Sequence, residues 1–148
     1  MQVVKEPICR RLKTDAEILA SFPLMRQLRP HAVQDESAYL RAIRKQEEEG
    51  YELHAAFMDE TMVAAAGIRL QRTLSRGPHL FVDDLVTDAA RAGQGIGRLL
   101  VAYLESIADR EGLSRIYLDS RDSACGFYKK LGFRCLTSRP CFLELKGQ

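Results

Sequence analysis

The sequence predicts an α+β fold, a mixed α/β domain in which an antiparallel front half precedes alternating strands and helices. Two largely apolar stretches, 51–58 and 62–72, are separated by three polar residues, which is typical of a hairpin. Apolar residues over 96–107 recur at the i, i+3, i+4, i+7 spacing of an amphipathic helix. Strand and helix patterns alternate on either side of that helix, and this order favours helices packed on a mixed sheet.

The front half contains recognisable helix signals. Thr14 and Glu17 have capping-box spacing, with an oxygen at the helix start and a carboxylate three residues later. Pro23 should bend or split the helix that follows Thr14, because proline lacks a backbone N–H. Gly50 stands where a left-handed cap would end the next helix. The other front-half elements expected are a strand at 7–12, a helix at 35–49 and the two hairpin strands.

The second half alternates strands and helices around a loop of small residues. Its helix at 96–110 ends near Gly112, and Asp122 is a suitable start for the last helix. The strands expected here are 80–87, 115–119, 133–135 and 141–145.

Composition excludes several classes of protein. The chain has 148 residues, 46% of them hydrophobic and 28% charged, so we expect one globular domain spanning residues 1–148. A formal charge of +2 argues against a nucleic-acid binder. The four cysteines form no C-x-x-C pair and have no histidine cluster nearby, so we expect free thiols and no metal. The apolar runs are too short for a membrane span, which predicts a cytoplasmic protein.

The loop between strand and helix, residues 91–97, has glycine at positions 93, 95 and 97. Glycines at alternate positions let several backbone N–H groups turn toward one point, and the following helix adds its positive dipole end. Together these features predict a pyrophosphate site. A dinucleotide-binding fold competes, because Asp119 ends a strand downstream. However, that fingerprint requires its third glycine where Arg98 stands, and it requires the loop after the first strand.

Two motifs of the second half, one in the glycine loop at 95–97 and one at 126–133, where an aromatic pair precedes Leu-Gly-Phe, resemble the GNAT superfamily of acetyl-CoA-dependent N-acetyltransferases. Gly95-Ile-Gly97 matches the end of the family's Gln/Arg-x-x-Gly-x-Gly/Ala loop, and a helix of the usual pattern follows. Gly126-Phe-Tyr-Lys-Lys-Leu-Gly-Phe133 resembles the family's aromatic-Tyr-x-x-Leu-Gly-Phe helix exit. The family's loop Arg or Gln falls on Ala92, with an arginine one residue earlier at Arg91. The resemblance implies a GNAT-like α/β/α sandwich around a central, mostly antiparallel sheet with a splayed parallel strand pair.

The same resemblance implies acetyl-CoA as co-substrate. Its pyrophosphate would bind the loop amides, and its pantetheine would lie beside the strand that precedes the loop. The implied cofactor contacts are Leu85, Val86 and Thr87 in the strand, Ala92, Gly93, Gln94, Gly95, Ile96, Gly97 and Arg98 in the loop and helix start, and Arg121, which stands where many members have an asparagine that touches coenzyme A.

Acetyl transfer requires a deprotonated amine and benefits from a proton donor to the leaving sulfur. Tyr128 lies on the family's acid position, and a phenol carries its proton at neutral pH. The family often has an acidic residue two positions before the equivalent of Leu85, which makes Asp83 the candidate base. Strand alternation puts Asp83 and Asp84 on opposite faces of the sheet. Asp84, His79 and a water molecule stay open as alternative bases.

The resemblance therefore implies an N-acetyltransferase that transfers the acetyl group to a primary amine by direct attack in a ternary complex. The alternative is a non-catalytic acyl-CoA sensor on the same fold; a dinucleotide-dependent enzyme is disfavoured by the glycine spacing. The front helices, which form the acceptor pocket in this family, contain no diagnostic motif, so the sequence leaves the small-molecule or peptide acceptor open. Homodimers are common among relatives, and we expect no nucleic-acid or membrane partner.

Overall fold

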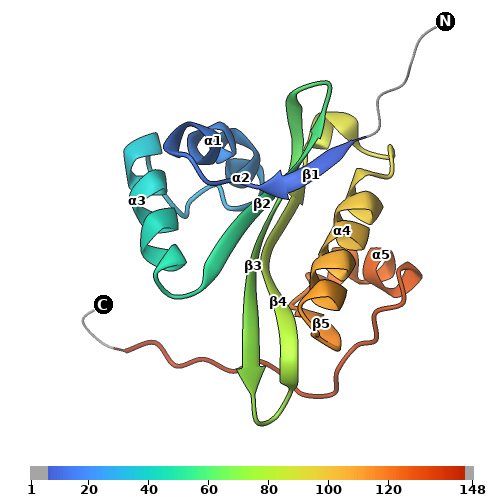
Figure 1. Ribbon diagram of the computed structural model, residues 1–148. Helices are drawn as coiled ribbons and strands as arrows, with labels where there is room; N and C mark the ends of the chain where they lie inside the picture. Colours follow the sequence, from blue (N-terminus) through green and yellow to red (C-terminus); the bar gives the residue numbers. More distant parts are fainter. Residues whose placement is uncertain (1–6, 146–148) are drawn as a thin grey trace, which may run out of the picture.

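A computed structural model describes residues 7–145 of the chain and contains a five-stranded sheet (Figure 1). Its strands lie in the spatial order β1-β2-β3-β4-β5, and neighbours are antiparallel except β4 and β5, which are parallel. The strands are β1 (Ile8–Arg11), β2 (Tyr51–Met58), β3 (Thr61–Thr73), β4 (Gly77–Thr87) and β5 (Arg115–Leu118). The predicted mixed, mostly antiparallel sheet is confirmed, with β4 beginning earlier than expected.

Helices cover both faces of this sheet (Figure 1). The helices on one face are α1 (Asp15–Ala20), α2 (Phe22–Leu28) and α3 (Glu36–Glu47); α4 (Ile96–Arg110) covers the other face, followed by α5 (Cys125–Lys130). Two short 3-10 helices, η1 (Ala89–Arg91) and η2 (Asp122–Ala124), precede α4 and α5. No helix within residues 7–145 is long and apolar enough to cross a membrane.

The sheet divides the apolar core into two main layers. On the α4 side, Val82 of β4 packs in one cluster with Leu100 and Leu104 of the helix. On the other side, Leu53 of β2 belongs to a cluster with Ile18 of α1 and residues of α2 and α3. These two layers confirm the predicted sandwich.

The helix signals read from the sequence have the expected geometry. The Glu17 amide donates to Thr14 Oγ1 at 3.1 Å, which caps α1. The helix breaks at Ser21, and Pro23 lies in the first turn of α2. Backbone N–H groups in a first turn have no acceptor within the helix, so proline is tolerated there. The Asp35 side chain accepts from the Ala38 amide at 2.8 Å and caps α3.

Strand β4 departs from regular pairing on both of its edges. On one edge β5 pairs with His79–Val82 alone, so β4 runs free of β5 over residues 83–87. On the other edge the register with β3 shifts beside Gly67, which faces Asp84, and Asp83 is left without an opposite residue. Such a β-bulge adds one residue to the strand and re-aims the side chains that follow. The parallel pair is therefore splayed, as the resemblance implies.

The two strands predicted at 133–135 and 141–145 are wrong, because this segment has no regular secondary structure. It leaves α5 and runs past the end of the sheet without joining it (Figure 1). A strand needs a neighbouring edge to pair its amides, and β5 offers a partner of four residues only. Phe142 and Leu143 are 89% and 83% exposed, so their apolar side chains find no core either.

Candidate active site

The glycine loop forms the turn from β4 into α4. Gly93 and Gly95 have φ angles of 80° and 75°, in the left-handed region that favours glycine, and Gly95 caps the helix. A Cβ atom at either position would meet no heavy atom beyond its chain neighbours within 4 Å, so the loop is open to solution. Within residues 7–145 the amides of 93–98 donate no hydrogen bond, and the amide of Leu99 is the first to do so. Free amides at the positive end of a 15-residue helix can bind an anion.

The cofactor contacts implied by the resemblance follow one path along β4 and into this loop. Leu85 packs against the α4-side core, whereas Val86 packs against α2, so the backbone between them runs along the free edge of the strand. Residues 92–95 of the loop and Arg98 are exposed. Ile96 is buried and holds the helix start against the sheet. In the structure, the strand positions 85–87 therefore lead directly into the loop and helix-start positions 92–98.

Phe127 of α5 covers the start of α4. A Cβ atom on Gly97 would lie 3.0 Å from Phe127 Cζ and 3.6 Å from Thr87 Cγ2, so a larger residue at this position would require the Phe127 ring to shift slightly. The Phe127 ring is 39% exposed beside the end of β4. Its position next to the loop was not predicted, although the helix motif of the second half contains it.

Two arginines lie at the end of α2, beside the free stretch of β4. Arg29 Nη2 donates to the Asp83 carbonyl oxygen at 3.0 Å. Arg121, from the segment after β5, donates through Nη2 to the Leu28 carbonyl oxygen at 3.2 Å. Arg121 therefore links the far side of the splayed pair to the front helices.

Tyr128 lies between two aromatic rings on α5. Its ring centroid is 5.1 Å from that of Phe127 and 5.5 Å from that of Phe133, both in edge-on arrangements. Burial raises the pKa of Tyr128, so the phenol is protonated at neutral pH. It lines a broad cavity between β5, α5 and the C-terminal segment. That cavity does not contain Asp83 or Asp84, so the structure does not bring the candidate acid and base into one cavity.

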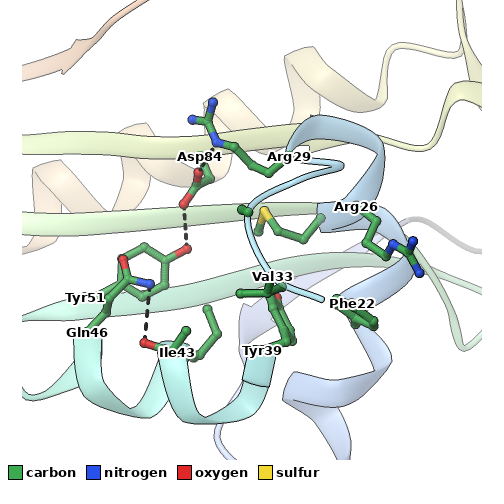
Figure 2. A pocket seen from close by; sticks show the side chains of 12 residues that line it. Phe22, Arg26, Arg29, Val33, Tyr39, Ile43, Gln46, Tyr51 and Asp84 are labelled. Atoms are coloured by element: carbon green, nitrogen blue, oxygen red, sulfur yellow. Dashed lines mark hydrogen bonds and ion pairs between the residues drawn. The ribbon is translucent and has the colours of Figure 1, made fainter. Parts of the chain in front are cut away.

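The expectation that Asp83 and Asp84 face opposite sides of the sheet is wrong, because the bulge turns both toward the front helices. Asp83 Oδ2 accepts from Arg69 Nε at 2.7 Å, and Arg69 also donates to the Glu49 carbonyl oxygen at the end of α3. Asp84 accepts from Arg29 Nε at 3.0 Å and from the Tyr51 hydroxyl at 2.9 Å (Figure 2). Asp83 is thus held by Arg69, and Asp84 is the carboxylate that lines a cavity.

That cavity, which we call the front cavity, has a volume of about 140 Å³ and lies between α2, α3 and the sheet (Figure 2). The rings of Phe22 and Tyr39 pack in its wall with centroids 5.0 Å apart, and Ser21 Oγ lies 2.7 Å from the Tyr39 hydroxyl. Burial raises the pKa of Tyr39 to about 12. The cavity is lined by Phe22, Met25, Arg26, Arg29, Ala32, Val33, Tyr39, Ala42, Ile43, Gln46, Tyr51 and Asp84.

Tyr51 reaches Asp84 by crossing β3 over Gly67. A Cβ atom on Gly67 would lie 1.8 Å from the Tyr51 hydroxyl oxygen, so this path requires glycine. Burial, together with the negative charge of Asp84, raises the pKa of Tyr51 well above its ordinary value. Sequence reasoning missed both Tyr51 and Arg29. A glycine inside a strand does signal a close approach, but it does not say which side chain makes it.

His79, the other candidate base, is buried and fully bonded. It is 1% exposed, with Nδ1 2.9 Å from the Gly77 carbonyl oxygen and Nε2 3.2 Å from Gln71 Oε1. Its ring therefore has no free nitrogen for a substrate. Among residues 7–145 no group of three or more His, Cys, Asp or Glu side chains is arranged to hold a metal ion.

Comparisons with known proteins agree on one family. The model of the Acetyltransferase (GNAT) family matches residues 17–133. The uncharacterized N-acetyltransferase YhdJ of Bacillus subtilis (strain 168) is 31% identical over 129 residues, 84% of this chain and 89% of that protein. Glucosamine 6-phosphate N-acetyltransferase of Trypanosoma brucei brucei is 33% identical over 75 residues, 49% of this chain and 51% of that protein. The crystal structure of a Trypanosoma brucei acetyltransferase shares the fold, with a TM-score of 0.78 at 23% identity over 95% of this chain and 100% of that one.

Proposed function

The chain belongs to the GNAT acetyltransferase family and is an N-acetyltransferase, for which the family implies acetyl-CoA as co-substrate; we propose that it acetylates a primary amine by direct attack in a ternary complex. We further propose that residues 1–148 form a single N-acetyltransferase domain. The observation that carries the mechanism is the splayed edge of β4, which leads directly into a loop whose amides are unbonded within residues 7–145.

In this proposal the pyrophosphate of acetyl-CoA binds the amides of 93–98, and pantetheine runs beside Leu85, Val86 and Thr87. The free backbone groups of these three residues pair with pantetheine as an additional strand would. Arg98 is exposed at the helix start, where its positive charge complements the phosphates. Arg121 contacts the cofactor from the β5 side of the gap.

The transfer requires a proton to leave the amine and another to reach the sulfur. The amine nitrogen attacks the thioester carbonyl carbon, so a C–N bond forms and the C–S bond breaks. Asp84, which lines the front cavity, takes the amine proton directly or through a water; Asp83, which lines neither of the two cavities described above, fits this role less well. Tyr128 donates its phenolic proton to the leaving sulfur. This step requires the thioester sulfur to lie on the α5 side of the gap between β4 and β5.

Acetyl-CoA binding provides the first test. At a ligand concentration 100 times Kd, binding stabilises the protein by about 2.7 kcal/mol, which raises Tm by roughly 5–10 °C in a domain of this size. NADH at the same concentration should give no comparable shift. An equal shift with NADH would contradict the assignment of the loop to coenzyme A.

Gly95→Glu tests the loop, with Gly112→Glu as its matched control. Both glycines have left-handed φ angles, 75° and 70°, with open space around the Cβ position, and they flank the two ends of α4. The strain of the substitution is therefore similar, but only Gly95→Glu brings a negative charge to the proposed pyrophosphate site. We expect Gly95→Glu alone to lose the acetyl-CoA shift. Equal behaviour of the two variants would reject the loop as the site.

Release of free thiol in the presence of an amine panel tests catalysis itself. A direct transfer gives intersecting initial-rate lines when both substrates are varied, whereas an acyl-enzyme gives parallel lines. Acetyl-CoA binding without thiol release for any amine would favour the alternative, a non-catalytic acyl-CoA sensor.

A further inference from the structure

We infer that the front cavity binds the acceptor and selects a small primary monoamine with an apolar body, a ring or a branched chain, whose nitrogen lies at Asp84. This inference rests on the proposed transfer from acetyl-CoA and adds the chemical class of its acceptor.

The front cavity adjoins the gap where β4 leaves β5. Pairing with β5 ends at Val82, two residues before Asp84, so the carboxylate stands at the beginning of the free edge. Arg29 bonds both Asp84 and the backbone of Asp83, and it borders the same cavity. An amine at Asp84 is therefore next to the stretch of β4 proposed to hold the thioester.

The size and lining of the front cavity suit an apolar group. An apolar cavity of about 150 Å³ can hold a benzene molecule, and the front cavity measures about 140 Å³. Most of its wall is apolar, with Phe22, Met25, Val33 and Ile43 among the lining residues. The wall is held in place by its own contacts, because the Phe22 and Tyr39 rings pack at a tilt of 35° and Ser21 Oγ contacts the Tyr39 hydroxyl. A wall fixed in this way lowers the cost of ordering on binding.

The charges around the front cavity disfavour an acceptor with a second positive group. Two guanidinium groups line it, those of Arg26 and Arg29, but Asp84 is the only carboxylate among the lining residues. Asp84 is already paired with Arg29, while Arg26 lies over the Phe22 ring at 5.4 Å. Nearby cations lower the pKa of a bound amine, because they disfavour its ammonium form, and so they increase the fraction able to attack. A polyamine would bring a further charge that this lining repels.

Competing acceptors measured side by side test the inference. The probes are 2-phenylethylamine, ethylamine, spermidine and glucosamine 6-phosphate, with initial rates read as thiol release at saturating acetyl-CoA. Filling an apolar pocket is worth about tenfold or more in kcat/KM, so 2-phenylethylamine should exceed ethylamine by at least that factor and should exceed the other two probes. A preference for spermidine or glucosamine 6-phosphate would overturn the inference.

Ala42→Leu provides a variant that fills the front cavity from α3, where Ala42 is one of the lining residues. We expect the preference for 2-phenylethylamine over ethylamine to fall at least about tenfold, with the thermal shift by acetyl-CoA retained. Ala102→Leu is the matched control, because Ala102 is exposed on α4 and borders neither cavity described here. An unchanged preference in Ala42→Leu would overturn the inference.

Direct binding separates this inference from the proposed function. Calorimetry with the coenzyme A complex should detect 2-phenylethylamine in the parent and in Ala102→Leu, and much weaker binding in Ala42→Leu. If acetyl-CoA binds and another amine is acetylated while 2-phenylethylamine neither binds nor reacts, only the acceptor class is wrong. If acetyl-CoA itself does not bind, the proposed function and this inference both fail.

Discussion

The contact between Gly67 and Tyr51 gives a sharp prediction for the substitution Gly67→Ala. The new Cβ atom would lie 1.8 Å from the Tyr51 hydroxyl oxygen, 2.2 Å from Cζ and 2.4 Å from Cε2, all far inside van der Waals contact. Tyr51 is 1% exposed and packs in the core cluster of the front helices, so its ring has little room to move. The variant must therefore displace the ring or separate β3 from its neighbours.

The expected cost combines two effects of this displacement. Overpacking of a core typically costs about 1–3 kcal/mol, and losing a hydrogen bond to a charged group costs about 1.5–3 kcal/mol. The lost bond here is the one from Tyr51 to Asp84. We expect Gly67→Ala to lower the free energy of unfolding by about 3–5 kcal/mol, or Tm by roughly 6–20 °C for a domain of this size.

Urea denaturation of the parent, Gly67→Ala, Tyr51→Leu and the double variant, together with one control variant, would measure this effect. In a Tyr51→Leu background the clashing atoms are absent, so Gly67→Ala should there cost less than about 1 kcal/mol, and the double-mutant cycle should show strong coupling. Gly126→Ala is the control, because Gly126 lies in α5 with free space around its Cβ position. It should stabilise the protein by about 0.5–1 kcal/mol. A Gly67→Ala protein within about 1 kcal/mol of the parent, or no coupling to Tyr51, would refute the packing argument.

Three further predictions concern catalysis and pH. Tyr128→Phe should keep acetyl-CoA affinity and lower kcat about 100-fold; a kcat within threefold of the parent would remove Tyr128 from the mechanism. Asp84→Asn should lower kcat at least about tenfold and Asp83→Asn much less, which rate measurements with a competent amine would check. Hydrogen bonding from His54 holds the pKa of Glu52 below its ordinary value. Its carboxylate therefore stabilises the fold above the unfolded-state pKa, and that contribution disappears as pH falls through the lower folded-state pKa. Melting curves of Glu52→Gln should accordingly depend less on pH below about 4.5 than those of the parent.

The elements predicted most accurately from the sequence depend on neighbours a few residues apart. The bounds of α4, Ile96–Arg110, agree with the prediction, because its apolar stripe and the glycines at either end act within single helical turns. The Thr14 cap and the break near Pro23 are local in the same sense. The glycine loop and the motif around Tyr128 are also contiguous, so the family resemblance could be recognised before any contact was known.

The arrangement of residues around Asp84 depends on contacts between distant segments of the chain. The orientation of Asp84 follows from a bulge, and a bulge is a property of two paired strands that neither strand's pattern reveals. Tyr51 and Arg29 reach Asp84 from 33 and 55 residues away. The C-terminal segment failed as a prediction for the same reason, because apolar alternation describes a strand's preference while pairing requires an edge that the fold must supply. Secondary structure and the glycine loop are therefore readable along the chain, whereas the front cavity exists only once α2, α3 and the bulged β4 have packed together.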